Sequence, residues 1–143
     1  MTPRAGHAVA MDELAGLMPF TALLGARTVT STPREVQLRL DWSPQRCTAG
    51  GVLHGGALMG LADAAGGLCA HLNVPAGNGT YATATIMSAT NFLRPVRDGY
   101  VDAVARPLRV GRTVIVVDTE LVDAAGRLVA RVTQTQTVHR VDR

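Results

Sequence analysis

One segment limits what this chain can fold into more than any other. Residues 52–72 are rich in glycine and alanine, contain no proline and include a single acid, Asp63. The length suits a helix, but five of these residues are glycines, and each costs about 1 kcal/mol relative to alanine inside a helix. Such a helix needs support from its surroundings. We therefore predict one long helix over residues 52–72, packed closely against a sheet that wraps around it.

The rest of the chain has the pattern of antiparallel strands separated by turns. Residues 35–42 alternate strictly, with Val36, Leu38 and Leu40 on one face, as in a half-buried strand. Turn-forming residues divide the remainder, and the predicted strands cover residues 23–30, 35–42, 80–93, 100–110, 113–122 and 128–138. A short helix, capped by Asp12 and ending at Leu17 because Pro19 stops it, comes before them.

Length and composition fit one folded domain. The chain has 143 residues, of which 47% are hydrophobic and 17% charged, so it can build a core without disulfides or metals. We predict an α+β fold in a single domain over residues 1–143, with its core over about residues 20–140 and a flexible stretch over residues 1–10.

Charge and cysteine content exclude several classes of function. The net charge is +3, and all fourteen basic residues are Arg, scattered along a chain with few aromatic residues. This distribution predicts no nucleic-acid partner and leaves two readings, an ordinary basic surface or a small phosphorylated ligand. Cys47 and Cys69 lack metal-ligand spacing, and the N-terminal residues lack an apolar signal segment. We expect free thiols, no metal, no membrane partner and a cytoplasmic location.

The first chemical feature is the start of the long helix. His54, Gly55 and Gly56 stand where a loop becomes a helix. The first amides of a helix have no internal acceptors, and the helix dipole favours negative charge there. Glycines let a ligand oxygen approach these amides, as an oxyanion hole requires. The alternative is a glycine-rich helix start that serves packing alone.

The second feature is Asp63, the only acid of this helix. A carboxylate among Ala and Gly is costly to bury unless it is paired or used, so it is either a catalytic group or a solvated side chain. Gly55 and Asp63 are eight residues apart, which is about 12 Å along a helix axis. One carbonyl cannot meet both groups of the same helix. If both act on one substrate, two antiparallel helices of a dimer must supply them.

The ordered set of motifs resembles the hotdog-fold acyl-CoA thioesterases of the phenylacetate-degradation (PaaI-like) type. The resemblance covers about residues 20–138, and the family implies a long helix wrapped by an antiparallel sheet, paired into homodimers and homotetramers. The activity it implies is hydrolysis of an acyl-CoA or aryl-CoA thioester, with no cofactor because CoA is part of the substrate. The motifs are His54-Gly55-Gly56 with Asp63 nine residues after the His, residues 91–95 (NFLRP), 111–113 (GRT) and 126–130 (GRLVA).

The resemblance also implies roles for individual residues. Asp63 matches the catalytic carboxylate, as nucleophile or general base, and Gly55 matches the residue whose amide polarises the thioester carbonyl. Thr85 matches a Ser or Thr that holds the attacking water or the carboxylate. His54 helps to shape the site, and Gly56 supports the turn. The candidates for binding the CoA phosphates are Arg94, Arg109 and Arg112.

The chain departs from the family pattern at two positions. Thr48 replaces the Asn or Gln often found six residues before the His, and Gly67 offers no side chain four residues after Asp63. The first departure motivates an alternative function, a non-catalytic hotdog module that binds acyl-CoA. A hotdog dehydratase is a third reading, but no matching motif is present. The acyl group and the way in which dimers pair stay open.

Overall fold

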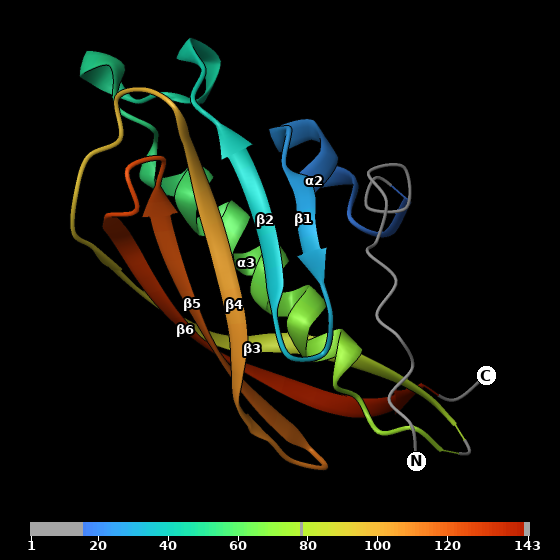
Figure 1. The fold of residues 1–143 in the computed structure, drawn as a ribbon. Helices are drawn as coiled ribbons and strands as arrows, with labels where there is room; N and C mark the ends of the chain where they lie inside the picture. Colours follow the sequence, from blue (N-terminus) through green and yellow to red (C-terminus); the bar gives the residue numbers. More distant parts are fainter. Residues whose placement is uncertain (1–15, 78, 142–143) are drawn as a thin grey trace.

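The computed structural model describes residues 16–77 and 79–141, and these form one antiparallel sheet around one long helix (Figure 1). The strand order is β1-β2-β4-β5-β6-β3. The α+β hotdog architecture predicted from the sequence is therefore confirmed. The elements are helix α2 (Pro19–Leu24), strands β1 (Arg27–Ser31) and β2 (Val36–Asp41), helix α3 (Gly55–Leu72), and strands β3 (Thr80–Phe92), β4 (Tyr100–Val110), β5 (Val114–Asp123) and β6 (Leu128–Val141).

The sheet curves around α3, which supplies much of the hydrophobic core (Figure 1). Leu61, Ala62 and Ala65 of this helix are fully buried, and they pack with the inward side chains of the strands. The helix begins at Gly55 instead of residue 52, because His54 caps it with its side chain. Among the described residues, no helix is long and apolar enough to cross a membrane.

The predicted strand over residues 23–30 is wrong in its first half. Helical structure ends at Leu17, as predicted, but Pro19 then begins a second helix, α2, since proline is favoured at the first position of a helix. Gly25 ends α2 with a φ of 90°, a left-handed conformation that suits glycine, and β1 starts at Arg27. The predicted cap at Asp12 and the predicted flexible stretch over residues 1–10 lie outside the described residues.

The strict alternation of β2 is confirmed, and its outer face carries a polar cluster. Val36, Leu38 and Leu40 are fully buried. On the other face, Arg39 binds Asp102 of β4 with two hydrogen bonds of 2.6 and 2.8 Å and stacks over the ring of Tyr100 at 3.7 Å. The hydrogen bond with the Asp102 carboxylate raises the pKa of Arg39 above its ordinary value. This cluster ties β2 to the centre of the sheet.

β3 forms one edge of the sheet, and most of it is exposed. It is 13 residues long, pairs with β6 on one side, and carries a bulge at Ile86, between Thr85 and Met87. Ile86 and Met87 are 64% and 61% exposed. A long, apolar, unpaired edge is a surface on which another strand can add. The single chain therefore presents a ready pairing edge at β3.

We expect removal of the Asp102 carboxylate to destabilise the fold strongly. Asp102→Ala leaves Arg39 half-buried without its partner, so the free energy of unfolding should fall by about 3 kcal/mol. Urea denaturation followed by circular dichroism measures it. The matched control is Asp41→Ala, which breaks the exposed pair between Arg27 and Asp41 and should cost less than about 1 kcal/mol. Equal losses in the two variants would contradict this account.

Candidate active site

The loop between β2 and α3 holds the start of the helix in place. Trp42 Nε1 donates to the Gly51 carbonyl at 3.1 Å, and Arg97 Nη1 donates to the Gly50 carbonyl at 2.9 Å. Gly50 and Gly51 have φ values of 77° and 73°, which residues with a Cβ rarely adopt. These two glycines therefore let the chain turn sharply and deliver His54 to the helix start.

The helix start is organised as an anion-binding end. The Gly56 amide donates to His54 Nδ1 at 2.8 Å, so a neutral His54 carries its proton on Nε2. The amides of Ala57 and Leu58 donate to the His54 carbonyl. Within the described part of the chain, the Gly55 amide has no acceptor, as expected for the first residue of a helix. Gly55 thus keeps a free donor at the positive end of α3.

Asp63 lies two turns further along α3 and is held by uncharged groups. Gln134 Nε2 donates to Asp63 Oδ1 at 2.8 Å, and Thr85 Oγ1 lies 3.5 Å from the same oxygen. Gln136 Nε2 donates to Thr85 Oγ1 at 2.7 Å. In the single chain Asp63 is exposed, and no cation pairs with it among the described residues. Its carboxylate is therefore oriented without being neutralised.

The two predicted halves of the site open into different cavities of the single chain. Gly55, Thr48 and Arg94 line a cavity of about 400 Å³. Asp63 and Thr85 line another of about 320 Å³. This separation agrees with the 12 Å estimate along the helix and with a site completed by a second chain.

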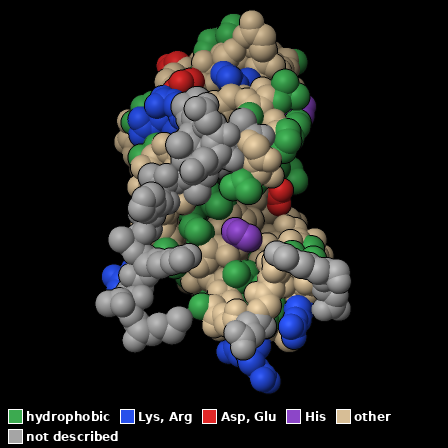
Figure 2. All heavy atoms as spheres, turned by 90° about the vertical axis from the view of Figure 1, so that its right-hand side faces the viewer, with side chains coloured by type: hydrophobic (Ala, Val, Ile, Leu, Met, Phe, Trp, Pro, Cys, Tyr) green, Lys and Arg blue, Asp and Glu red, His purple; other side chains and the backbone are tan. Residues whose placement is uncertain are grey.

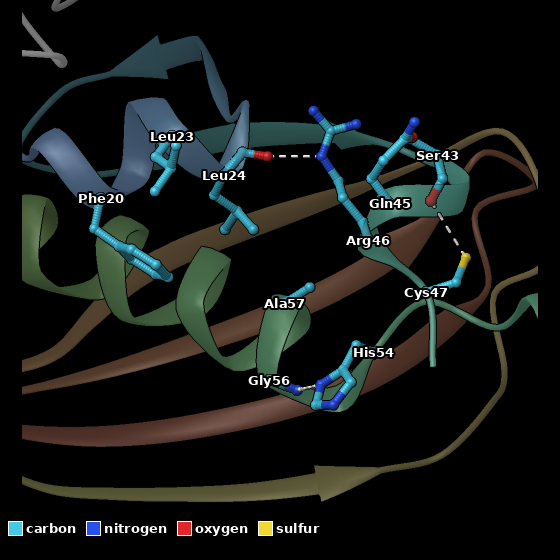
Figure 3. Close-up of a pocket in the computed structure, with 10 residues that line it drawn as sticks. All are labelled: Phe20, Leu23, Leu24, Ser43, Gln45, Arg46, Cys47, His54, Gly56 and Ala57. Atoms are coloured by element: carbon cyan, nitrogen blue, oxygen red, sulfur yellow. Dashed lines mark hydrogen bonds between the residues drawn. The ribbon is translucent and has the colours of Figure 1, made fainter. Parts of the chain in front are cut away.

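A third cavity, of about 540 Å³, lies on the other side of the helix start (Figure 3). Phe20, Leu23 and Leu24 of α2 form one wall, and His54 and Gly56 stand at its base (Figure 3). Arg46 closes this region, because its Nε donates to the Leu24 carbonyl at 2.6 Å and ties the loop to the end of α2.

The predicted CoA-binding arginines do not all come together. Arg94 follows the end of β3 and shares a cavity with Gly55. Arg109 and Arg112 lie near the turn between β4 and β5, exposed, and they line none of these three cavities. In the register of the sheet, Arg109 pairs with Val116. This pair lies level with Met87 of β3, and not with Phe92 at the end of β3. In one chain, Arg94 is therefore the only one of the three beside the predicted oxyanion donor.

Comparison with known proteins identifies the family of the chain. The sequence model described as the thioesterase superfamily matches residues 50–130, more than half of the chain. The chain belongs to the thioesterase superfamily. The matched segment contains the helix start, Asp63, Thr85 and Arg94, whereas Thr48, Gln134 and Gln136 lie outside it.

Individual proteins are similar to this chain in sequence or in fold. A candidate esterase of Saccharolobus solfataricus is 44% identical over 82 residues, which cover 57% of this chain and 56% of the relative. The match thus spans little more than half of that protein. A thioesterase variant from Pseudomonas aeruginosa is 25% identical with a TM-score of 0.85, covering 99% of this chain and all of the other. A variant of the phenylacetic acid degradation protein PaaI from Thermus thermophilus is 27% identical with a TM-score of 0.74, covering 83% of this chain and 97% of the other.

Gln134 and Gln136 are site residues that the sequence analysis missed. Both are almost fully buried and face α3 from β6. The signal was present: between Val132 and Val138 every second residue points inward, and two of those inward positions are glutamines. A buried amide needs a hydrogen-bond partner, and here the partners belong to Asp63 and Thr85.

Gly66 makes room for this network. A Cβ on Gly66 would overlap Gln134 Oε1, so the glycine permits the buried amide to lie against the helix. By contrast, a Cβ on the neighbouring Gly67 would meet nothing within 4 Å. Packing against Gln134 therefore requires a glycine at position 66, whereas no neighbouring atom of the described chain requires one at position 67.

These two glycines give a matched pair of variants. Gly66→Ala should lower the free energy of unfolding by about 1–2 kcal/mol, because Gln134 is fully buried and cannot withdraw freely. Gly67→Ala should leave stability unchanged or raise it by up to about 1 kcal/mol through better helix propensity. Thermal and urea unfolding of both proteins measure the difference. A Gly66→Ala protein as stable as Gly67→Ala would show that Gln134 does not depend on this space.

Proposed function

We propose that the protein hydrolyses acyl-CoA or aryl-CoA thioesters to the free acid and CoA, with Asp63 of one subunit and the Gly55 amide of another acting on the same thioester. One observation carries the proposal: α3 bears a free amide at its N-terminus and, two turns later, a carboxylate held only by neutral donors. These are the two groups that thioester hydrolysis needs, a donor for the oxyanion and a base or nucleophile.

The Gly55 amide would stabilise the charge that develops on the carbonyl oxygen. Because this N–H has no acceptor among the described residues, a thioester oxygen can accept from it without breaking an existing bond. The dipole of α3 adds to the stabilisation, since the helix is 18 residues long and its positive end lies there. His54 supports the arrangement by holding the Gly56 amide, and its Nε2–H is a second donor nearby.

We propose that Asp63 acts as a general base. The gap of 3.5 Å between Thr85 Oγ1 and Asp63 Oδ1 is too long for a strong hydrogen bond, and a water can bind to both groups. Asp63 takes a proton from this water while the water oxygen bonds to the thioester carbon. The C–S bond then breaks, and the CoA thiolate leaves with the proton that Asp63 had taken, which restores the carboxylate. Gln134 and Gln136 act as positioning residues, because they orient Asp63 and Thr85.

The free edge of β3 supports the homodimer. An antiparallel pairing of β3 with its copy, centred on Ala89, places Phe92 of one subunit opposite the Ile86 bulge of the other. Phe92 covers Gly55, with its ring 3.2 Å from where a Gly55 Cβ would lie, and Thr85 stands beside Asp63. This pairing therefore brings the Gly55 amide of one subunit towards Asp63 of the partner subunit, and symmetry creates two such sites.

Further parts of the proposal concern CoA, assembly and location. Arg94, beside Thr48 in the Gly55 cavity, is the first candidate for a CoA phosphate, and Arg109 and Arg112 would contribute only if another subunit brings them near. Exposed Leu108 and Val110 at the end of β4 offer a second apolar contact for a homotetramer. We propose that no metal or cofactor is needed and that the protein works in the cytoplasm, where Cys47 and Cys69, both free thiols, stay reduced.

Two substitutions test the catalytic groups. Asp63→Ala should lower kcat by about 10³-fold, because it removes the base. Gly55→Pro should lower kcat by about 10²-fold, because it removes the amide donor. Proline is tolerated at the first helical position, although its ring adds atoms near Phe92. The extended backbone of His54 (φ −62°, ψ 134°) accepts a following proline. The matched control Gly55→Ala adds a Cβ but keeps the amide, and should lose much less activity.

Release of free thiol from a panel of acyl- and aryl-CoAs measures these rates, with and without EDTA. EDTA should leave the wild-type rate unchanged. Wild-type protein that turns over none of the thioesters would overturn the enzyme proposal, and CoA binding without turnover would instead identify the protein as the non-catalytic acyl-CoA-binding module.

A mixed dimer tests whether two chains share each site. Asp63→Ala and Gly55→Pro chains, co-expressed with different tags and purified through both, form a heterodimer with one intact site and one site that lacks both groups. Such a heterodimer should regain about half of the wild-type kcat per dimer, although each parent homodimer is nearly inactive. A heterodimer as inactive as its parents would contradict the shared site. A fully active protein that light scattering shows to be a folded monomer would contradict it as well.

A further inference from the structure

The Asp63 cavity continues along α3 beyond the catalytic residues. It has a volume of about 320 Å³ and runs from Asp63 and Thr85 past Gly67 to His71. Its apolar lining comes from Leu17, Met18 and Leu68. Figure 2 shows, on the side of the molecule to the right in Figure 1, hydrophobic side chains gathered around a histidine, with an acidic side chain beside them. The cavity therefore has a carboxylate near one end, apolar walls and an imidazole near the other.

Gly67 leaves space in this cavity that no other part of the described chain fills. Each other glycine of α3 has a close neighbour at the position of a Cβ: Phe92 at Gly55, His54 at Gly56, Leu24 and Phe20 at Gly60, and Gln134 at Gly66. At Gly67 nothing lies within 4 Å. Glycine is among the least favourable residues inside a helix, and packing among residues 16–77 and 79–141 gives no reason for it here. The vacant volume lies one helical turn from Asp63, where the acyl part of a thioester would extend.

His71 lies at the other end of the same cavity, two helical turns beyond Asp63. Eight residues correspond to about 12 Å along the helix axis, which is a suitable span for a compact acyl group between side chains that reach towards it. No hydrogen bond or ion pair of the described residues involves the His71 imidazole, although the ring has both a donor and an acceptor when neutral. An unengaged imidazole at the end of an apolar cavity can recognise a polar group at the far end of a ligand.

We propose that Gly67 and His71 determine which acyl group the protein accepts. The acyl group lies over Gly67, against Leu68 and Met18, and its far end carries a hydrogen-bonding group that meets the His71 imidazole. The accepted class is thus a compact, mainly apolar acyl group with a polar far end. This inference rests on the proposed thioesterase function, because it assigns the acyl subsite of that same reaction.

The test compares acyl-CoAs that differ in one property at a time. Acetyl-CoA is the small probe, phenylacetyl-CoA the bulky one, and 4-hydroxyphenylacetyl-CoA adds one hydroxyl at the far end. In Gly67→Ala, kcat/KM for phenylacetyl-CoA should fall by about ten-fold or more, because one methyl group enters the acyl space, whereas acetyl-CoA should change by less than about two-fold. In His71→Leu, the wild-type preference for the hydroxylated substrate over phenylacetyl-CoA should fall by about ten-fold.

His139→Leu is the matched control, since His139 is an exposed histidine on β6 outside this cavity. It should keep the wild-type selectivity, and the melting temperature of Gly67→Ala should be no lower than that of the wild type. If the wild type hydrolyses these thioesters and both Gly67→Ala and His71→Leu keep its selectivity, this inference is overturned and the thioesterase function stands. Wild-type protein inactive on every thioester would overturn both.

Discussion

The contact between Gln134 and Asp63 is the interaction on which the candidate site depends most. It joins β6, the strand next to the β3 edge, to the central helix, and Gly66 makes the room that lets this buried amide lie against the helix backbone. The amide fixes one carboxylate oxygen at 2.8 Å and leaves the other available. The same residue thus serves packing and chemistry, because a fully buried Gln must find a partner and Asp63 supplies it.

The glycines of α3 weaken it as an isolated helix, and some of them have a local reason in the fold. Gly55 lies beneath the Phe92 ring, Gly56 lies against the His54 ring, and Gly66 admits Gln134. The loss of helix propensity is offset by burial of leucine and alanine side chains against the wrapping sheet. An isolated helix with this sequence would be unstable, so helix formation and sheet closure must be cooperative. The site forms as part of the core rather than as an addition to it.

The hydrophobic periodicity and the positions of turn-forming residues predicted most of the fold. The alternation in β2 and the turns around residues 94–99, 111–113 and 123–127 placed the later strands within a few residues. α2 was missed because Pro19 both ends and begins helices, and its apolar residues also suit a strand. For the candidate site, the spacing between Gly55 and Asp63 was enough to predict that two chains supply the two groups. Gln134 and Gln136 belong to none of the motifs, so the alternation within β6 was the only signal for them. Arg109 and Arg112 line neither the Gly55 cavity nor the Asp63 cavity of the described chain.

The pattern of charge pairing separates Asp63 from five other acids of the described residues. Every basic residue of the chain is an arginine, and five arginines pair with acids in the described part of the structure: Arg27 with Asp41, Arg39 with Asp102, Arg106 with Glu35, Arg127 with Asp123 and Arg131 with Asp118. Asp63 instead receives an amide and a hydroxyl. A guanidinium stabilises the charged form of a carboxylate and so weakens it as a base. Neutral donors orient the carboxylate without neutralising its charge, as the proposed role of a general base requires.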